Sequence, residues 1–146
     1  ALRYFNVFGP RQDPSSQYSG VIPRFLSQAL GGEPLVIFGD GSQSRDFTYV
    51  ANVVDGVLRA CTSTKASGQA INVATGGRVS LLELLAALNR VMDTSAVPEF
   101  GPVRQGDVKD SQASIAKAKD LLGYEPIVDF EEGLRRTVAW YRSSQS

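Results

Sequence analysis

Strand-like and helix-like patterns alternate along the whole chain, and this alternation is the feature that most limits its fold. Short runs rich in β-branched and aromatic residues predict strands at 1–8, 35–38, 45–50 and 70–74. Apolar residues at helical spacing predict helices at 22–30, 50–61, 81–92, 114–123 and 129–140. The alternation predicts an α/β or α+β fold and argues against a helical bundle or a β-sandwich. The 146 residues suit a single domain.

Several of the expected helices carry recognisable ends. Ser80 and Glu83 have the spacing of a capping box, in which a hydroxyl and a carboxylate each satisfy one backbone N–H. Ser114 is predicted to cap a short helix that ends at Gly123, and Asp129 is predicted to start the final helix. The segment 94–110, which contains two prolines, is expected to be irregular.

The chain opens directly on the β-rich run 1–8, with no residues before it that could cover a strand. A buried parallel strand needs neighbours on both sides. The opening therefore predicts that the chain is cut from a larger protein. Every apolar run is broken by a charge well before the ~18 residues that a membrane span requires, so no membrane segment is expected.

The composition excludes several classes of site. The sequence has no His, which excludes Ser-His-Asp and Cys-His catalysis and every zinc site that uses His. Its one cysteine, Cys61, lies in an apolar helical stripe and is predicted to be a small core residue; no metal site is expected. The 15 basic residues balance 15 acidic ones, which argues against nucleic acid or an anionic membrane as partner. The lack of paired cysteines favours a cytoplasmic protein.

Arginines dominate the basic residues, because the sequence has 11 Arg and 4 Lys. This bias either indicates recognition of phosphate or carboxylate, or reflects compositional drift. Arg45 and Arg104 each precede an aspartate, Asp46 and Asp107, and each pair is either a solvated surface pair or part of an anion site. Asn6 stands at the end of a predicted strand, where α/β proteins bind ligands. From the residues alone the function stays open.

The run 39–44 resembles part of a dinucleotide-binding fingerprint, but the third glycine is missing. A strand-like run follows it, so no helix N-terminus is available to hold a pyrophosphate. We therefore predict a hairpin turn there. The sequence also contains no P-loop, and no Tyr is followed four residues later by Lys.

Six ordered motifs follow the opening run Arg3–Pro14, and together they resemble one family across essentially the whole chain. They are Val21–Pro23, Leu35–Gly41, Ser44–Phe47, Ile71–Ala74, Arg104–Asp107 and Leu121–Pro126. The sequence resembles the substrate-binding part of extended short-chain dehydrogenases, most of all the NAD-dependent UDP-sugar 4-epimerases.

The resemblance implies an α/β, α+β-like fragment, the C-terminal substrate-binding lobe of an extended short-chain dehydrogenase that lacks most of the Rossmann sheet. Residues 1–10 would be the last part of the Rossmann strand and its loop, and residues 11–146 the UDP-sugar-binding lobe. The family's Gly-x-x-Gly-x-x-Gly and Tyr-x-x-x-Lys segments are absent from this sequence. We therefore expect no epimerase activity and no catalytic residue in this chain alone; NAD is the cofactor of the full-length family and is not expected to bind to this chain by itself.

The resemblance also implies roles for nucleotide-side residues. Gly20 and Val21 would offer backbone groups to the nucleotide. Val36 and Phe38 would flank the uracil, and Asp107 would accept hydrogen bonds from the ribose.

Further roles concern the diphosphate, the cofactor and the sugar. Arg45 and Arg104 would grip the diphosphate and Asn6 would hydrogen-bond to it. Phe5 would contact the nicotinamide side of NAD. Ser111 stands where relatives confined to unacetylated hexoses tend to carry Tyr, so it resembles the members that accept UDP-N-acetylhexosamines.

Alternative readings stay open. The chain could be a non-catalytic nucleotide-sugar binding or assembly module, or a piece of a sugar-nucleotide 4,6-dehydratase or decarboxylase. An exposed sheet edge also predicts a homodimer or a domain swap through residues 1–10.

Overall fold

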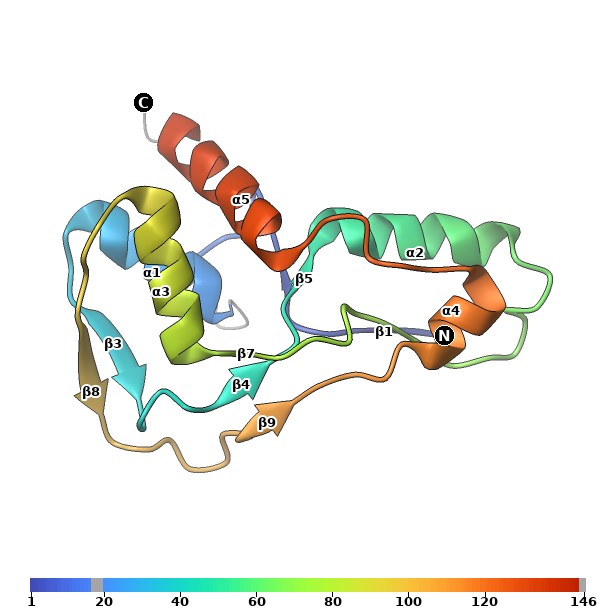
Figure 1. Ribbon diagram of the computed structural model, residues 1–146, viewed down its shortest axis with the longest axis horizontal. Coiled ribbons are helices and arrows are strands. Elements are labelled where there is room, and N and C mark those ends of the chain that lie inside the picture. The colour runs from blue at the N-terminus through green and yellow to red at the C-terminus, as the bar shows by residue number, and fades with distance from the viewer. Residues whose placement is uncertain (17–19, 145–146) are drawn as a thin grey trace.

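The computed structural model describes residues 1–16 and 20–144, and within them it has an α/β fold, as the alternating pattern predicts (Figure 1). The helices are α1 Val21–Gly31, α2 Val50–Thr62, α3 Leu81–Met92, α4 Ala116–Leu122 and α5 Phe130–Ser144. The strands are β1 Leu2–Tyr4, β2 Val7–Phe8, β3 Leu35–Phe38, β4 Ser44–Arg45, β5 Thr48–Tyr49, β6 Ile71–Val73, β7 Val79–Ser80, β8 Pro98–Gly101 and β9 Asp110–Ser111.

The strands form small separate sheets within the described residues. Three are parallel pairs, β1 with β6, β2 with β5 and β3 with β8, and in the fourth β4 pairs antiparallel to β7 and parallel to β9. The hairpin predicted at 39–44 is therefore wrong, because β3 and β4 belong to different sheets. The segment is still a turn, since the Asp40 carboxylate accepts hydrogen bonds from the N–H and hydroxyl of Ser42.

The opening run 1–8 is two short strands instead of the single strand predicted. Asn6 breaks it, with φ of 35° in the left-handed region that Asn tolerates better than most residues. Its carbonyl accepts a hydrogen bond from the Thr48 N–H at 3.3 Å and its amide donates to the Asp46 carbonyl at 3.4 Å. The break sends β1 to β6 and β2 to β5.

The buried apolar side chains form two clusters. The larger one lies among α1, α3, α5 and strands β2, β3 and β5, with Leu26, Leu84 and Leu134 fully buried. The smaller one lies between β6 and α4 and contains Val73 and Tyr124. Figure 1 shows the corresponding arrangement, with α1 and α3 at one end of the molecule and α2 and α4 at the other.

The helix α2 buries only part of its apolar stripe: Val53 is buried, but the rest of the inward face is formed by Asn52 and Gly56. Its buried face contains Gly56, where a Cβ atom would lie 2.7 Å from Val73 Cγ1, so only glycine permits this close approach to β6. Val54 and Leu58 are instead 52% and 62% exposed. Cys61 is also exposed, so the prediction of a core cysteine is wrong. The close packing of Gly56 decides the rotation of the helix, and apolar spacing could not show it.

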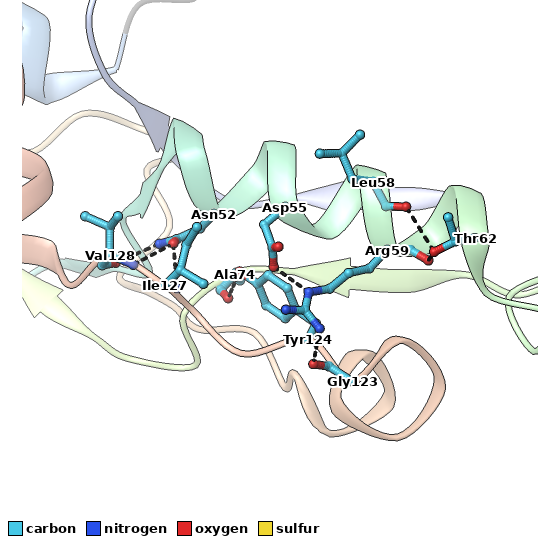
Figure 2. A network of polar contacts seen from close by, with 10 residues as sticks. All are labelled: Asn52, Asp55, Leu58, Arg59, Thr62, Ala74, Gly123, Tyr124, Ile127 and Val128. Atoms are coloured by element: carbon cyan, nitrogen blue, oxygen red, sulfur yellow. Dashed lines mark hydrogen bonds and ion pairs between the residues drawn. The ribbon is translucent and has the colours of Figure 1, made fainter.

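A polar network joins α2 to the segment between α4 and α5 (Figure 2). The fully buried Asn52 amide donates to the Val128 carbonyl at 2.8 Å and accepts from the N–H groups of Ile127 and Val128, both at 2.9 Å. The Tyr124 hydroxyl donates to the carbonyl of Ala74 at 2.9 Å. Arg59 reaches the Gly123 carbonyl at 2.7 Å. The bonds of Asn52 and Arg59 hold α2 against this segment, and the bond of Tyr124 holds the segment to the residue after β6.

Two of the predicted helix starts are confirmed. Ser80 Oγ accepts from the Glu83 N–H at 3.2 Å and the Glu83 carboxylate accepts from the Ser80 N–H at 2.7 Å, which completes the capping box. The N–H of Ser80, and then its hydroxyl, which donates to the same carboxylate at 2.8 Å, hold the pKa of Glu83 below its usual value. The Asp129 carboxylate accepts from the Glu132 N–H at 2.8 Å at the start of α5, which continues past residue 140 to Ser144.

The predicted cap at Ser114 is wrong, while the predicted end of the same helix at Gly123 is confirmed. The helix α4 begins at Ala116, and among the described residues no side chain caps it. Gly123 adopts a φ of 60° and closes α4 as a left-handed cap. The segment 94–110 is more ordered than expected, because β8 begins at Pro98 and pairs with β3. Proline is tolerated there, at the first residue of an edge strand.

Candidate functional site

A buried carboxylate organises the segments around the candidate site. Asp46 is fully buried, and its Oδ1 accepts from the Thr75 N–H at 3.0 Å and the Thr75 hydroxyl at 2.5 Å. Its Oδ2 accepts from the N–H groups of Gly76 at 3.0 Å and Ala113 at 3.3 Å. One side chain therefore ties together three segments that are distant in sequence, and Arg45 precedes it directly.

A cleft of about 430 Å³ lies between β3, the start of α1 and the connection from β8 to β9. All the predicted substrate-binding residues except Ser111 line this cleft, namely Asn6, Gly20, Val21, Val36, Phe38, Arg45, Arg104 and Asp107. The structure thus brings together residues that lie as far apart in the sequence as Asn6 and Asp107. The volume of the cleft is within the range of small-molecule sites.

Arg45 is held firmly at one wall of the cleft. Its Nη2 lies 2.6 Å from Asp107 Oδ1, and its Nη1 donates to the carbonyls of Ser44 at 2.8 Å and Lys109 at 3.3 Å. The side chain is 17% exposed, so the guanidinium is presented without being free to rotate. A guanidinium fixed in this way is well suited to a phosphate or carboxylate.

Arg104 and Asp107 are the two ends of one tight turn. The Asp107 N–H donates to the Arg104 carbonyl at 3.2 Å, and Gly106 supplies the φ of 84° that the third position of a type II turn requires. The Arg104 guanidinium lies over the Phe38 ring, 3.8 Å from its centroid. The turn is thus attached to β3 by Arg104 and to β4 by Asp107.

The N-terminus of α1 opens into the same cleft. Gly20 is its extended N-cap residue, and among the described residues no side chain caps the first turn and no acidic residue lies within it. Val21 and Ile22, the first residues of the helix, line the cleft. Backbone N–H groups at a helix N-terminus favour negative charge, so this end adds to the field of the arginines.

The apolar wall of the cleft comes from β3. Val36 and Phe38 are two residues apart and half-buried, so they share the face of the strand that looks into the cleft. Gly101 of β8 pairs with Phe38 and leaves space for its ring, because a Cβ atom at Gly101 would lie 3.1 Å from Phe38 Cδ1. An aromatic ring beside anchored arginines can accept a planar base whose substituent is anionic.

Two predicted residues stand apart from the cleft lining. Ser111 lies in β9, paired in register with Arg45, and is half-buried beside the cleft. Phe5 precedes Asn6 at the break between β1 and β2 and is half-buried. Both are next to cleft residues, in the chain or in the sheet.

The cleft also contains residues that the sequence did not single out. Arg24 adds a third cation from α1, and Phe47 adds an aromatic ring to those of Phe8, Phe25 and Phe38. Arg24 lies one turn beyond Gly20, and this spacing is the signal that could have identified it. The Gln43 amide donates to the Phe38 carbonyl at 2.6 Å and is 9% exposed, so it holds the end of β3. Nothing in the local pattern around Gln43 indicates that contact.

Local hydrogen bonds lower the pKa of one carboxyl group near the site, that of Asp40. Bonds from the hydroxyl and then the N–H of Ser42 hold the pKa of Asp40 below its usual value. Asp40 is exposed in the turn that follows Phe38 and is not part of the cleft lining. Within residues 1–16 and 20–144, no three His, Cys, Asp or Glu side chains gather as a metal ion would require.

The turn 39–44, which resembles part of a dinucleotide-binding fingerprint, does not fit the pyrophosphate of a dinucleotide. The turn after β3 leads into β4, and a strand offers no helix N-terminus to a pyrophosphate. Phe5 is then the one predicted contact to NAD.

In the part of the chain that the structure describes, no helix has the length and apolar character needed to cross a bilayer.

Comparison with known proteins places these features in one family. Residues 1–74 match the NAD dependent epimerase/dehydratase family. The UDP-glucose 4-epimerase of Mycolicibacterium smegmatis is 40% identical over 138 residues, which are 94% of this chain and 44% of that protein. A UDP-N-acetyl-alpha-D-glucosaminuronate decarboxylase of Bacillus cytotoxicus is 31% identical over 151 residues, with 99% of this chain and 46% of that protein covered.

A solved structure agrees with the fold as well. The crystal structure of UDP-glucose 4-epimerase from Thermotoga maritima with UDP-glucose superposes with a TM-score of 0.93 at 39% identity, over 99% of this chain and 46% of that chain. The chain spans less than half the length of each of these relatives. The matched residues 1–74 are half of the sequence, and the α/β fold corresponds to part of the epimerase fold, so the chain belongs to the NAD dependent epimerase/dehydratase family.

Proposed function

We propose that the cleft binds the nucleoside diphosphate portion of a UDP-sugar, as the UDP-sugar-binding part of an NAD-dependent sugar-nucleotide 4-epimerase. The observation that carries this proposal is the convergence of Arg45, Arg104, the Phe38 ring and the N-terminus of α1 on one cleft. Each charge-assisted bond from an arginine to a phosphate contributes ~1.5–3 kcal/mol. The names of the three relatives cover two sugars and two reactions but share UDP, which supports UDP as the part recognised here.

In this proposal the base stacks against Phe38 beside Val36, and Asp107 accepts hydrogen bonds from the ribose. Arg45 and Arg104 bind the diphosphate, with help from Asn6. The backbone at Gly20 and Val21 adds donors from the start of α1. All these residues line the cleft, so no large rearrangement of the backbone is required.

The sugar would lie toward Ser111, which is paired in register with Arg45. The small side chain of Ser111 leaves more room than a tyrosine would. We therefore expect a UDP-N-acetylhexosamine to be accepted as well as a UDP-hexose. Replacement by Tyr should lower the affinity for UDP-N-acetylglucosamine more than the affinity for UDP-glucose; an equal loss for both would contradict the assignment.

Isothermal titration calorimetry of the 146-residue chain with UDP and UDP-glucose tests the binding proposal. We expect dissociation constants in the micromolar range, and a loss of about tenfold or more for Arg45→Gln, because one charge-assisted bond is removed. Arg90→Ala is the matched control, since Arg90 is exposed outside the cleft and pairs with Glu131 at 3.5 Å. The proposal fails if wild type gives no binding heat at millimolar UDP, or if Arg45→Gln binds as tightly as wild type.

The chain by itself is proposed to bind without turnover. The acid–base Tyr-x-x-x-Lys pair and the glycine-rich nucleotide loop of the family do not occur in this sequence, and the turn 39–44 leads into a strand instead of a helix. Incubation with UDP-galactose or UDP-N-acetylglucosamine plus NAD should give no epimer by chromatography. Any enzyme-dependent turnover would refute this expectation.

The decarboxylase among the relatives favours a second candidate, a piece of a sugar-nucleotide decarboxylase or dehydratase. A decarboxylase must bind a sugar carboxylate, so the cleft would then prefer UDP-glucuronic acid to UDP-glucose. Equal affinity would leave the epimerase as the better proposal. Binding of every UDP-sugar no tighter than UDP itself would favour a non-catalytic nucleotide-sugar module.

We also propose that the chain associates with a second copy through residues 1–10. Within the described residues β1 pairs only with β6, so its other edge presents unpaired backbone groups, and Tyr4 is 50% exposed. Val54 and Leu58 add an exposed apolar stripe on α2. Light scattering should give a dimer mass at high concentration; a strictly monomeric mass would refute the proposal.

A further inference from the structure

The turn 104–107 occupies the cleft with its own side chains. Arg104 lies over the Phe38 ring at 3.8 Å, and Asp107 lies 2.6 Å from Arg45. In the proposed function Phe38 receives the base and Arg45 receives a phosphate. Each of these two positions is thus contacted by one end of the same turn.

The guanidinium and a base would compete for Phe38. Both are planar groups that stack on an aromatic ring, and the ring is already bounded on another side by Gly101, where an added Cβ would lie 3.1 Å from Cδ1 and 3.2 Å from Cε1. Arg104 and Phe38 both line the cleft, so the guanidinium covers the part of the ring that a bound base needs. A base can stack there only after Arg104 leaves the ring.

We propose that Arg104 is a specificity-determining residue that excludes nucleosides without a phosphate. This inference rests on the proposed function. A nucleoside alone must displace the guanidinium and gives it no new partner. A nucleoside diphosphate offers the displaced guanidinium a charge-assisted contact, which is stronger than its contact with the ring. Arg104 therefore lowers the affinity for a nucleoside and raises the affinity for a nucleoside diphosphate.

These two opposite effects give a direct test by titration with uridine and with UDP. Removal of an exposed cation–π contact should tighten uridine binding by roughly two- to fivefold in Arg104→Ala. The same substitution should weaken UDP binding by about fivefold or more, because the phosphate contact is lost. Saturation-transfer NMR suits the weak uridine complex and calorimetry suits UDP. Arg90→Ala is the matched control and should leave both affinities unchanged.

A double-mutant cycle assigns the gain to the ring. In a Phe38→Leu background there is no aromatic face to uncover, so adding Arg104→Ala should not tighten uridine binding further. Tighter uridine binding in the double variant than in Phe38→Leu would overturn the proposal.

The outcomes separate this inference from the proposed function. Absence of UDP binding by the wild-type chain would refute the proposed function and this inference with it. If wild type binds UDP, but Arg104→Ala binds uridine equally or less tightly than wild type, the selectivity is refuted while the UDP site stands. Weaker uridine binding by Arg104→Ala than by wild type would mean that the guanidinium stacks on the base instead of competing with it.

Discussion

The substitution Asp46→Asn tests the claim that one buried carboxylate holds three segments around the cleft. All four of its hydrogen-bond partners are donors: the Thr75 N–H and hydroxyl on Oδ1, and the N–H groups of Gly76 and Ala113 on Oδ2. An amide has one oxygen, so whichever way it is oriented its NH₂ group faces two donors. Asparagine is nearly the same size as aspartate, which separates the loss of acceptors from any change of packing.

The magnitude follows from the groups left without an acceptor. If the NH₂ faces Thr75, one buried N–H is orphaned and the hydroxyl must rotate; if it faces the other side, two N–H groups are orphaned. Each buried unsatisfied group costs about 1–3 kcal/mol, so we expect a loss of about 2–4 kcal/mol in the free energy of unfolding. That is a large fraction of the ~5–15 kcal/mol typical of a domain.

Urea unfolding followed by circular dichroism measures this loss, and the expected midpoint lies about 1–2 M below that of wild type. Asp40→Asn is the matched control. Asp40 is exposed, and one of its oxygens accepts both bonds from Ser42, so an asparagine keeps them. Its free energy of unfolding should stay within about 0.5 kcal/mol of wild type.

The reasoning is refuted if Asp46→Asn also stays within about 0.5 kcal/mol of wild type. If that variant does not fold, Thr75→Val provides the measurement, because it removes the 2.5 Å bond that the hydroxyl donates to Asp46 and the 3.0 Å bond that it accepts from the Gly77 N–H, and it should cost about 1–2 kcal/mol. A Thr75→Val variant as stable as wild type would then contradict the argument.

Three further predictions concern the rest of the fold. Asn52→Ala removes a buried amide with three backbone bonds and should cost about 2–4 kcal/mol in urea unfolding, whereas Asn72→Ala, whose amide makes one bond of 3.2 Å at the surface, should cost under about 1 kcal/mol. Burial, followed by the charges of two nearby carboxylates, raises the pKa of Tyr124 to about 12. Because this pKa lies above the unfolded value of 10, the contribution of Tyr124 to the free energy of unfolding should be complete below pH 10 and be lost as the pH rises through about 12. Tyr124→Phe should remove this pH dependence from unfolding curves recorded over a series of pH values. An unchanged pH dependence in the variant would contradict the assignment. Ser80→Ala should lower the free energy of unfolding by about 1 kcal/mol through loss of the cap, while Ser27→Ala, exposed on α1, should not lower it; equal effects would argue against the capping box.

The elements that sequence patterns predict well are those fixed by neighbouring residues. The capping box at Ser80, the start of α5 at Asp129 and the end of α4 at Gly123 depend on contacts within a few residues, and the structure has each of them. The predictions that failed depend on distant partners. The face that α2 buries is set by Gly56 against Val73, and the order of the segment at Pro98 is set by β3.

The candidate site shows the same division. No local pattern brings Asn6, Arg45 and Arg104 into one cleft, and only the resemblance to a family predicted that they converge. Arg24 and Gln43 were missed for the opposite reason. Each lies in a segment whose local pattern is explained without it, Arg24 on the polar side of α1 and Gln43 within a turn.

The parallel ladders also determine when the cleft can exist. Leu2 pairs with Ile71, Leu35 with Pro98 and Ser44 with Asp110, so each ladder closes a long loop. High contact order of this kind slows folding. On the ribosome, Leu35 and Ser44 emerge long before their partners Pro98 and Asp110, and β3 must wait with both its edges open. The cleft therefore cannot assemble until residues 98–111 have been made, and until then the unpaired strand β3 is exposed to aggregation.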